Sequence, residues 1–284
     1  MPALTDSGYI RDLLSRHGFR FSKSLGQNFL VNPSVCPRMA ESCGAGEEDG
    51  VLEIGPGIGV LTRELAARAG RVAAVELDSR LLPVLRETLS GCGNVAVVPG
   101  DILKIDLAAL LREQFGSRRV YVCANLPYYI TSPVILRLLE SRLPFRGITV
   151  MVQKEAAVRL CARPGTRECG AVSLAVQYYA RPQRLFPVSR GSFLPAPRVD
   201  SEVIRLDVRE RPPCAVRDES RLFVLIRAAF NQRRKTLPNS LTGAGLTKEQ
   251  ALSLLQAAGI PPTARAEELT LEQFATLANG STDR

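Results

Sequence analysis

The chain has 284 residues and a formal net charge of +9; 45% of its residues are apolar and 23% are charged, which excludes a disordered protein. No stretch approaches the ~20 consecutive apolar residues that cross a bilayer, and charged residues between Asp6 and Arg20 argue against a secretory signal sequence. The seven cysteines form no CxxC pair and the one histidine is His17, so we expect a cytoplasmic protein with no disulfide framework and no metal site.

Short apolar runs alternate with helical patterns between residues 50 and 153. The predicted strands are Val51–Ile54, Arg71–Glu76, Val95–Pro99, Val120–Ala124 and Gly147–Gln153. The predicted helices between them are Val60–Ala69, Arg80–Leu89, Leu107–Phe115 and Pro133–Leu139. This alternation predicts an α/β fold with a doubly wound, Rossmann-like parallel sheet that helices cover on both faces.

The pattern changes after Gln153. We predict a short helix at Lys154–Cys161, a turn at Arg163–Thr166, and strands at Val172–Tyr179 and Ser201–Val208. A proline-rich linker follows at Arg209–Asp218. Three amphipathic helices follow at Ser220–Arg234, Thr247–Ala258 and Thr270–Ala278, the second with a capping box from Thr247 to Gln250. We therefore predict a catalytic domain over residues 1–208, with a basic N-terminal tail over 1–24 in which His17 is solvated, and a small helical domain over residues 209–284.

Positive charge is concentrated in the middle of the chain. Residues 100–206 carry +8, whereas residues 1–99 carry −1 and residues 207–284 carry +2, and 32 of the 37 basic residues are arginine. Arginine makes forked contacts with phosphate, although a basic composition alone is equally compatible with no nucleic-acid partner. Local clusters favour a polyanion partner: Arg11, Arg16, Arg20 and Lys23 in the tail, and Arg233, Arg234 and Lys235 in the helical domain.

A glycine loop joins the first predicted strand of the sheet to its helix. Its glycines are Gly55, Gly57 and Gly59, and the acid Glu53 precedes them. Glycine allows a sharp turn and a close approach of the backbone to a ligand. The third glycine comes one residue too early for a dinucleotide loop, and no Lys-Ser/Thr pair follows as in a P-loop. This spacing indicates an S-adenosylmethionine site.

Acidic residues end the next two predicted strands. Glu76 comes 21 residues after Gly55, where a carboxylate can accept both hydroxyls of a ribose, and Asp101 can accept from the exocyclic amine of a purine. The alternative is a simple glycine turn with surface acids, which the agreement of strand, turn, helix and two acids disfavours.

The segment from Asn125 to Tyr128 follows the fourth predicted strand of the sheet and should face the same crevice. An amine conjugated to an aromatic ring is a poor nucleophile, and acceptors on Asn125 and Leu126 would favour its pyramidal transition state. Pro127 would keep the turn rigid and Tyr128 would stack on the base. Read alone, the segment is equally compatible with a strand-ending turn.

Through these and further motifs, the sequence resembles the KsgA-type (RsmA) 16S ribosomal RNA adenine N6,N6-dimethyltransferases over nearly its whole length. The segments that carry the resemblance are Leu25–Leu30, Glu53–Gly59, Glu76, Gly100–Asp101, Asn125–Tyr128, Val152–Glu155, Phe193–Ser201, Phe230–Leu237 and Arg265–Thr270.

The resemblance implies dimethylation of two adjacent adenosines in the loop of the 3′-terminal hairpin of 16S rRNA, in an immature 30S particle, by a monomeric enzyme that uses S-adenosylmethionine. It adds Asn28 and Leu30 to the cofactor residues, Phe193 as a second stacking surface, and Arg198 to the RNA contacts. The target base would have to leave its loop to enter the pocket.

Two positions depart from the family pattern, and several other functions stay open. Arg198 replaces a commoner lysine, and Pro238 is expected to end the preceding helix early and to weaken one phosphate contact. The alternatives are a 23S rRNA methyltransferase of the macrolide-resistance type, a mitochondrial relative that acts in transcription, a non-catalytic ribosome-assembly factor and a nicotinamide-dependent oxidoreductase.

Overall fold

A computed structural model describes residues 3–19 and 27–281 and divides the chain into two compact units. The first unit comprises Met1–Ala157 and Gln183–Val208, and the second comprises Val158–Pro182 and Arg209–Arg284. The second unit thus includes a segment, residues 158–182, that the predicted domain division at 208/209 assigns to the catalytic domain. Which unit binds RNA stays a prediction.

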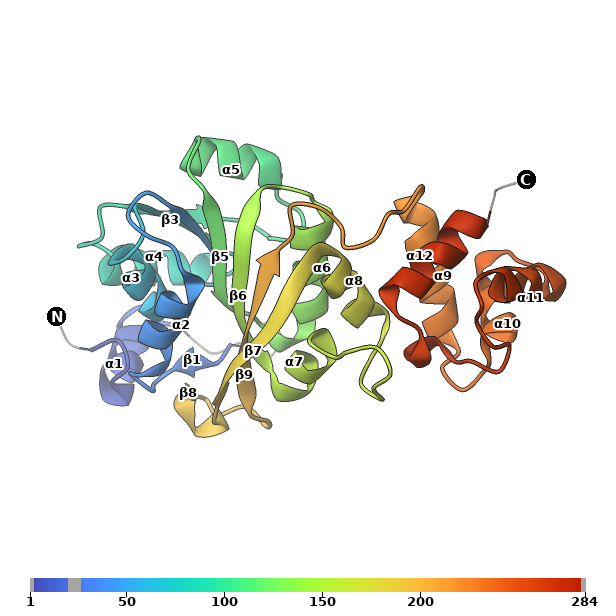
Figure 1. Cartoon of the computed structure of the whole chain (residues 1–284). Coiled ribbons are helices and arrows are strands. Elements are labelled where there is room, and N and C mark those ends of the chain that lie inside the picture. The colour runs from blue at the N-terminus through green and yellow to red at the C-terminus, as the bar shows by residue number, and fades with distance from the viewer. Residues whose placement is uncertain (1–2, 20–26, 282–284) are drawn as a thin grey trace. The chain divides into compact units, whose positions relative to one another are not determined.

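A seven-stranded sheet in the order β4-β3-β2-β5-β6-β9-β7 contains nearly all the strand residues of the structure (Figure 1). Its strands are β2 (Gly50–Ile54), β3 (Arg71–Glu76), β4 (Val95–Pro99), β5 (Val120–Asn125), β6 (Phe145–Gln153), β7 (Ala180–Val188) and β9 (Ser201–Val208). Strands β2 to β6 are parallel and β9 pairs antiparallel with β6. The predicted α/β fold with a Rossmann-like sheet is confirmed.

Helices connect the parallel strands, as the βαβ pattern predicts. The connecting helices are α3 (Val60–Ala66), α4 (Leu82–Thr88), α5 (Leu107–Phe115) and α6 (Thr131–Glu140), with the 3₁₀ helices η2 (Ser79–Leu81) and η3 (Tyr128–Ile130). Helix α2 (Val35–Cys43) precedes β2, α7 (Lys154–Leu160) follows β6, and the 3₁₀ helix η4 (Arg190–Ser192) follows β7. One core cluster joins α2 and α3 to the inner strands, and Met39, Val51 and Val72 in it are fully buried. Burial of both faces explains why these strands read as continuous apolar runs.

The N-terminal segment is not a solvated tail. Residues Ser7–Arg16 form helix α1, whose Ile10 and Leu13 are fully buried in a cluster with Phe29, Ile58 and Leu85. The sequence prediction was wrong because α1 buries its apolar face on the domain. Arg20 and Lys23 of the predicted basic cluster, and Leu25 and Gly26 of the Leu25–Leu30 motif, lie outside the described residues.

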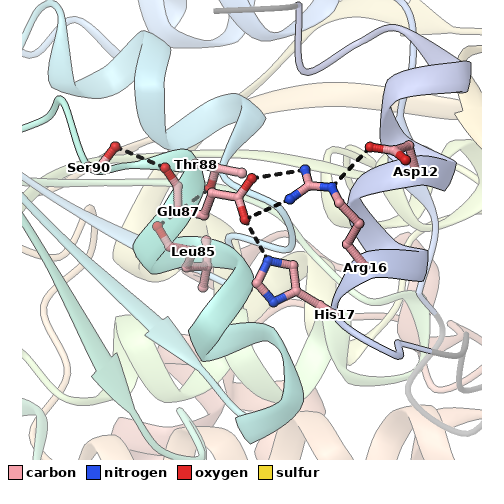
Figure 2. Close-up of polar contacts among 7 residues, drawn as sticks. All are labelled: Asp12, Arg16, His17, Leu85, Glu87, Thr88 and Ser90. Atoms are coloured by element: carbon pink, nitrogen blue, oxygen red, sulfur yellow. Dashed lines mark hydrogen bonds and ion pairs between the residues drawn. The ribbon is translucent and has the colours of Figure 1, made fainter.

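A charged cluster ties α1 to α4, as Figure 2 shows. The Glu87 carboxylate accepts two hydrogen bonds from the Arg16 guanidinium, at 2.9 and 3.3 Å, and lies 2.7 Å from His17 Nε2. Arg16 Nε also donates to Asp12 Oδ2 at 3.0 Å. His17 is therefore paired with an acid in the folded domain, not solvated as predicted.

The predicted strand Val172–Tyr179 is wrong: Ala171–Tyr179 forms helix α8. Its residues Leu174 to Val176 and both tyrosines are buried, so the run lacks the polar face that distinguishes an amphipathic helix. Ser173 stabilises the helix start, since its Oγ accepts from Gly170 N–H at 3.0 Å and donates to Arg159 O at 2.6 Å.

The second unit is helical apart from the start of β7. Its helices after residue 209 are α9 (Glu219–Asn231), α10 (Leu237–Ser240), α11 (Lys248–Ala257) and α12 (Leu271–Gly280), with 3₁₀ helices η5 (Leu241–Ala244) and η6 (Ala266–Glu268). The predicted capping box of α11 is present, with Gln250 N–H donating to Thr247 Oγ1 at 3.1 Å. None of the helices in residues 3–19 and 27–281 is long and apolar enough to cross a membrane.

Pro238 does not shorten the preceding helix. Helix α9 ends at Asn231, seven residues earlier, and Pro238 lies in the first turn of α10. A proline there loses no intrahelical hydrogen bond, because the first N–H groups of a helix have no partner inside it. The expected effect on the helix is therefore wrong.

Candidate active site

A pocket of the first unit opens at the carboxyl ends of the parallel strands. It contains about 1060 Å³ of space free of protein atoms, partly open to solvent. It lies where the strand order changes direction, with β3 on one side of β2 and β5 on the other. Ligands of open α/β sheets bind at such a switch point. Every predicted cofactor and target-base residue lines it: Asn28, Leu30, Gly55, Gly57, Glu76, Asp101, Asn125, Leu126, Pro127, Tyr128 and Phe193.

The glycine loop after β2 adopts backbone angles that favour glycine. Gly55, Gly57 and Gly59 have φ values of 69°, 61° and 88°. Gly55 N–H donates to Val75 O at 2.9 Å, which holds the loop against β3. A Cβ added to Gly57 would lie 3.1 Å from Phe29 Cε1, so this glycine also permits close packing of the loop on β1 (Phe29–Leu30).

Glu76 ends β3 with a buried carboxyl group in the pocket wall. Burial raises its pKa, while backbone N–H groups of Asp78 and Gly57 act in the opposite direction. The hydrogen bond from Asp78 N–H to Glu76 Oε1 is 2.8 Å long. The carboxylate is thus held in place and can accept further hydrogen bonds from a ligand.

The loop after β3 is also tied to the N-terminal segment. Gln27 Nε2 donates to Asp78 Oδ2 at 2.7 Å, and Arg80 donates to both oxygens of the same carboxylate. The Arg80 contact, followed by Gln27, lowers the pKa of Asp78 against the effect of its burial. Gln27 lines the pocket, and no motif in the sequence predicted this contact.

Asp101 lies in the loop after β4, with a partly exposed side chain. Its Oδ1 accepts from Leu103 N–H at 2.9 Å and its Oδ2 lies 3.7 Å from Lys104 Nζ. The first contact fixes the turn and orients the carboxylate. The second is a solvent-exposed ion pair of small energetic value.

Glu53, the acid before the glycine loop, is buried on β2 with 1% of its surface exposed. Burial raises its pKa to about 8, and the nearby Glu76 acts in the same direction. Its Oε2 and the hydroxyl of Thr62 are buried with no hydrogen-bond partner among the described residues. Glu53 does not line the pocket.

A second wall of the pocket comes from two short strands far apart in sequence. Strand β1 pairs antiparallel with β8 (Phe193–Leu194), so that Leu30 faces Phe193 in the register. Phe29, Leu30 and Phe193 are all buried, with at most 6% of their surface exposed. The pairing places the predicted cofactor residue Leu30 next to the predicted stacking residue Phe193.

Asn125 is the last residue of β5 and pairs with Met151 of β6 in the register. Leu126 N–H donates to Met151 O at 3.2 Å, and Leu126 is 1% exposed, so the strand end is anchored on its neighbour. Within residues 3–19 and 27–281, no hydrogen bond engages the Asn125 side chain. Its amide can therefore bind a ligand in the pocket.

The next two residues form a rigid corner of the pocket. Pro127 O accepts from Ile130 N–H at 3.1 Å, which closes the turn into η3. The Tyr128 hydroxyl lies 2.7 Å from Ser201 Oγ at the start of β9, and burial raises the pKa of Tyr128. The ring is thus fixed by a contact across the site and remains neutral at physiological pH.

The predicted RNA-binding residues lie outside the pocket. Arg198 is exposed in the segment between β8 and β9 of the first unit. Arg233, Arg234 and Lys235 are exposed in the second unit, after α9. Arg233 also has a structural role, since its Nη2 donates to the carbonyl oxygens of Arg167 and Cys169 at 2.6 and 3.0 Å.

Sequence reasoning missed several residues of the pocket. Leu77 and Tyr129 line it with 50% and 54% of their surfaces exposed, and Phe29 closes it against the glycine loop. A signal for the first two existed, because each directly follows a residue predicted to bind a ligand, Glu76 or Tyr128. Phe29 lies within the Leu25–Leu30 motif, but its packing on the glycine loop has no local signal, because its partners come from distant parts of the chain.

Comparison with known proteins identifies the family. Residues 18–283 match the family model described as ribosomal RNA adenine dimethylase. The ribosomal RNA small subunit methyltransferase A of Geobacillus sp. (strain WCH70) is 47% identical over 277 residues, which cover 96% of this chain and 95% of that protein. The same-named protein of Bacillus cereus (strain B4264) is 48% identical and covers 95% and 94%.

Solved structures agree with this result. A dimethyladenosine transferase from Plasmodium falciparum is similar with a TM-score of 0.73 and 26% identity over 88% of this chain and 95% of that one. The 23S rRNA methyltransferase ErmE is similar with a TM-score of 0.67 and 28% identity over 89% and 99%. Because the family model and the relatives span almost the whole chain, this protein belongs to the ribosomal RNA adenine dimethylase family.

Proposed function

We propose that this protein dimethylates N6 of two adjacent adenosines in the loop of the 3′-terminal hairpin of 16S rRNA, with S-adenosylmethionine as methyl donor. It acts on the immature 30S particle during small-subunit biogenesis. The observation that carries the proposal is that the glycine loop, Glu76, Asp101 and Asn125–Tyr128 line one pocket. One chain supplies all of these residues, so the proposed enzyme is active as a monomer. Because its proposed substrate is a ribosomal precursor, we expect it to act in the cytoplasm.

The cofactor half of the pocket fits S-adenosylmethionine. The donor supplies an electrophilic methyl group on a positively charged sulfur. Glu76 is a buried acceptor suited to the ribose hydroxyls, and Asp101 is suited to the adenine amine. The glycine backbone at Gly55 and Gly57 leaves room for the ligand, while Asn28 and Leu30 border it from β1 and the residue before it. S-adenosylmethionine carries no phosphate, so the loop needs no basic residue to bind it.

The target half of the pocket suits an exocyclic purine amine. Asn125 has an amide oxygen available for hydrogen bonding, and the Leu126 carbonyl is the second acceptor of the proposal. Two acceptors hold the hydrogens so that the nitrogen lone pair leaves conjugation with the ring, which favours the transition state over the planar ground state. Tyr128 and Phe193 are the stacking surfaces, and Pro127 keeps the corner rigid.

No general base is needed in this scheme. The amine becomes acidic once it is alkylated, and water accepts the proton. The main contribution of the protein is to hold the amine in line with the methyl group, which is worth roughly 7–11 kcal/mol of the barrier in well-oriented systems. The Tyr128 hydroxyl lies 2.7 Å from Ser201 Oγ, and this hydrogen bond holds the ring in a fixed position for stacking.

The choice of small-subunit RNA rests on the relatives. Two proteins named ribosomal RNA small subunit methyltransferase A are 47% and 48% identical to this chain, whereas the 23S enzyme ErmE is 28% identical. In the proposal, exposed basic residues of both units contact RNA phosphates: Arg198, Arg233, Arg234 and Lys235.

The decisive experiment is a methylation map. Small subunits that lack the two dimethyladenosines are incubated with the protein and isotope-labelled S-adenosylmethionine, and large subunits are treated in parallel. Mass spectrometry of RNA fragments should find four labelled methyl groups on two adjacent adenosines of 16S rRNA and none on 23S rRNA. Label in 23S rRNA, or no label in either RNA, would overturn the proposal.

A further inference from the structure

Tyr129 is an exposed aromatic residue at the mouth of the pocket. It lies in η3 directly after Tyr128, and 54% of its surface is exposed. The two tyrosines differ in their surroundings, since the Tyr128 hydroxyl is bonded to Ser201 while the Tyr129 ring is mostly open to solvent. Because Tyr129 also lines the pocket, its exposed ring is placed to stack on a base at the pocket mouth.

The segment that anchors Tyr128 adds a second exposed apolar side chain. Ser201 follows Val199 by two residues, and Val199 is 44% exposed. The backbone of this segment is fixed, because Asp200 O accepts from Lys154 N–H at 3.0 Å and Asp200 Oδ1 accepts from Arg190 N–H at 2.9 Å. Val199 therefore lies in a fixed segment, two residues before the serine that binds the Tyr128 hydroxyl.

Three exposed basic residues are linked to the same segment. Lys154 and Arg190 bind Asp200 through their backbone N–H groups and have exposed side chains, and Arg198 lies two residues before Asp200. Lys154 and Arg190 contact this segment through their backbones, and Arg198 is part of it. This concentration of positive charge favours a polyanion over a protein surface as the occupant. All of them belong to the first unit, as does the pocket.

We propose that Tyr129 and Val199, with these cations, form a subsite for the nucleotide next to the adenosine that is being methylated. This inference rests on the proposed function. An adenosine that enters the pocket carries a neighbour with it, whose base has been unstacked and whose phosphate lies at the pocket mouth. Tyr129 stacks on the neighbouring base, Val199 contacts its edge, and Arg198 with Lys154 and Arg190 contacts the flanking phosphates.

The test is a double-mutant cycle between Tyr129 and the flanking base. The substrates are undermethylated 30S particles reconstituted with 16S rRNA that is intact, or that lacks the base directly 5′ or directly 3′ of a target adenosine. In each particle, one of the two target adenosines is replaced by guanosine, which has a carbonyl oxygen in place of the N6 amine. Each assay then reports methylation of a single target. The variants are Tyr129→Ala and the ring-preserving control Tyr129→Phe.

For the wild type, we expect removal of one flanking base to lower kcat/KM about tenfold, the order of magnitude of one base stacked on an aromatic side chain. Tyr129→Ala should cause a loss of about the same size on intact RNA, mainly in KM, and no further loss on RNA that lacks that base. Tyr129→Phe should stay within about twofold of the wild type, because the ring is retained. The dissociation constant of S-adenosylmethionine, measured by calorimetry, should not change in either variant.

Additive losses at both flanking positions would overturn the subsite, because Tyr129 and the base would then act independently. A Tyr129→Ala variant with wild-type kinetics would also overturn it, as would a loss that Tyr129→Phe shares. These outcomes differ from a failure of the proposed function, in which the wild type itself leaves intact 30S particles unmethylated. Thermal unfolding of both variants identifies any loss that arises from misfolding.

Discussion

The two walls of the pocket have different origins. The strand-end wall consists of Gly55, Gly57, Glu76, Asp101 and Asn125, and each residue is placed by the strand that it follows or ends. The β1–β8 wall consists of Phe29, Leu30 and Phe193 and exists only because two dipeptide strands, more than 160 residues apart, pair with each other. The groups with chemical functions lie mainly in the first wall, and the groups that enclose the pocket lie mainly in the second.

The walls meet where Phe29 packs on Gly57. A side chain at Gly57 would lie 3.1 Å from the Phe29 ring, and Phe29 is also part of the cluster that buries α1. Closure of the pocket therefore depends on the N-terminal helix, although α1 itself contributes no residue to the lining. A local motif can specify the chemistry of a site, whereas its enclosure depends on tertiary packing.

The sharpest way to separate the walls is Asn125→Ala, for which we expect the largest effect. Loss of the amide acceptor should lower kcat about 10²- to 10³-fold, as for other preorganised polar groups that act in the transition state. Stability should change little, because no described side-chain hydrogen bond is lost. Single-turnover methylation of 30S particles and thermal unfolding measure the two quantities.

A matched control for this variant is Asn94→Ala. The Asn94 amide donates to the carbonyl oxygens of Ala66 and Ala69 at 2.9 and 2.8 Å, at the end of α3 and away from the pocket lining. Its removal should lower the melting temperature and leave kcat unchanged. If Asn125→Ala keeps full activity, or if both variants lose activity equally, the catalytic role of Asn125 is wrong.

The enclosing wall is tested by Phe29→Ala. Phe29 is 6% exposed, and removal of a buried phenylalanine side chain typically costs about 3 kcal/mol or more of folding free energy. We expect weaker S-adenosylmethionine binding together with faster proteolysis of α1, since the same ring supports the glycine loop and the α1 cluster. Urea unfolding, calorimetry and limited proteolysis measure these effects.

Phe29→Leu is the conservative control and should recover most of the stability and affinity. An alanine variant that binds the cofactor normally would show that the strand-end wall suffices by itself. The β1–β8 wall would then contribute to the stability of the fold and not to cofactor binding.

The two walls also differ in how far they could be predicted from sequence. The strands that carry Glu76 and Asn125 were predicted within one residue, because buried parallel strands are short apolar runs with clear ends. The pairing of β1 with β8 was not predicted, since two-residue strands have no periodicity and their contact is nonlocal. Helix α1 was mistaken for a tail, although its apolar residues Ile10, Leu13 and Leu14 have helical spacing.

The pH dependence of stability tests Glu53, a buried residue of β2 just before the glycine loop of the strand-end wall. Burial raises the pKa of Glu53 from 4.5 to about 8, so the folded state keeps a proton that the unfolded chain has released. The contribution of Glu53 to stability is fully present below pH 4.5 and is lost as the pH rises through about 8. Glu53→Gln stays neutral and should remove this decline, on the order of 3 kcal/mol between pH 5.5 and pH 8.5.

The measurement is the difference in unfolding free energy between wild type and Glu53→Gln at the two pH values. Taking the difference removes the contributions of acids that do not interact with Glu53, since they titrate alike in both proteins. A difference that does not change with pH would show that Glu53 is ionised in the folded protein throughout.

The smallest expected effect concerns the ion pairs that hold α1, the support of the enclosing wall. Arg16, and after it His17, lowers the pKa of Glu87, so these contacts stabilise the fold above the usual glutamate pKa and lose that effect as the pH falls below it. The side chains are well exposed, so Glu87→Gln should lower the melting temperature slightly at neutral pH and low salt, and less at 1 M salt.

Glu64→Gln is the matched control, because Glu64 pairs with Arg68 at 3.0 Å inside one chain segment and joins no separate helix. Hydrogen exchange should therefore become faster in α1 for Glu87→Gln alone. Equal exchange in both variants would mean that apolar packing of Ile10 and Leu13 holds the helix by itself, and that the enclosing wall needs no electrostatic support.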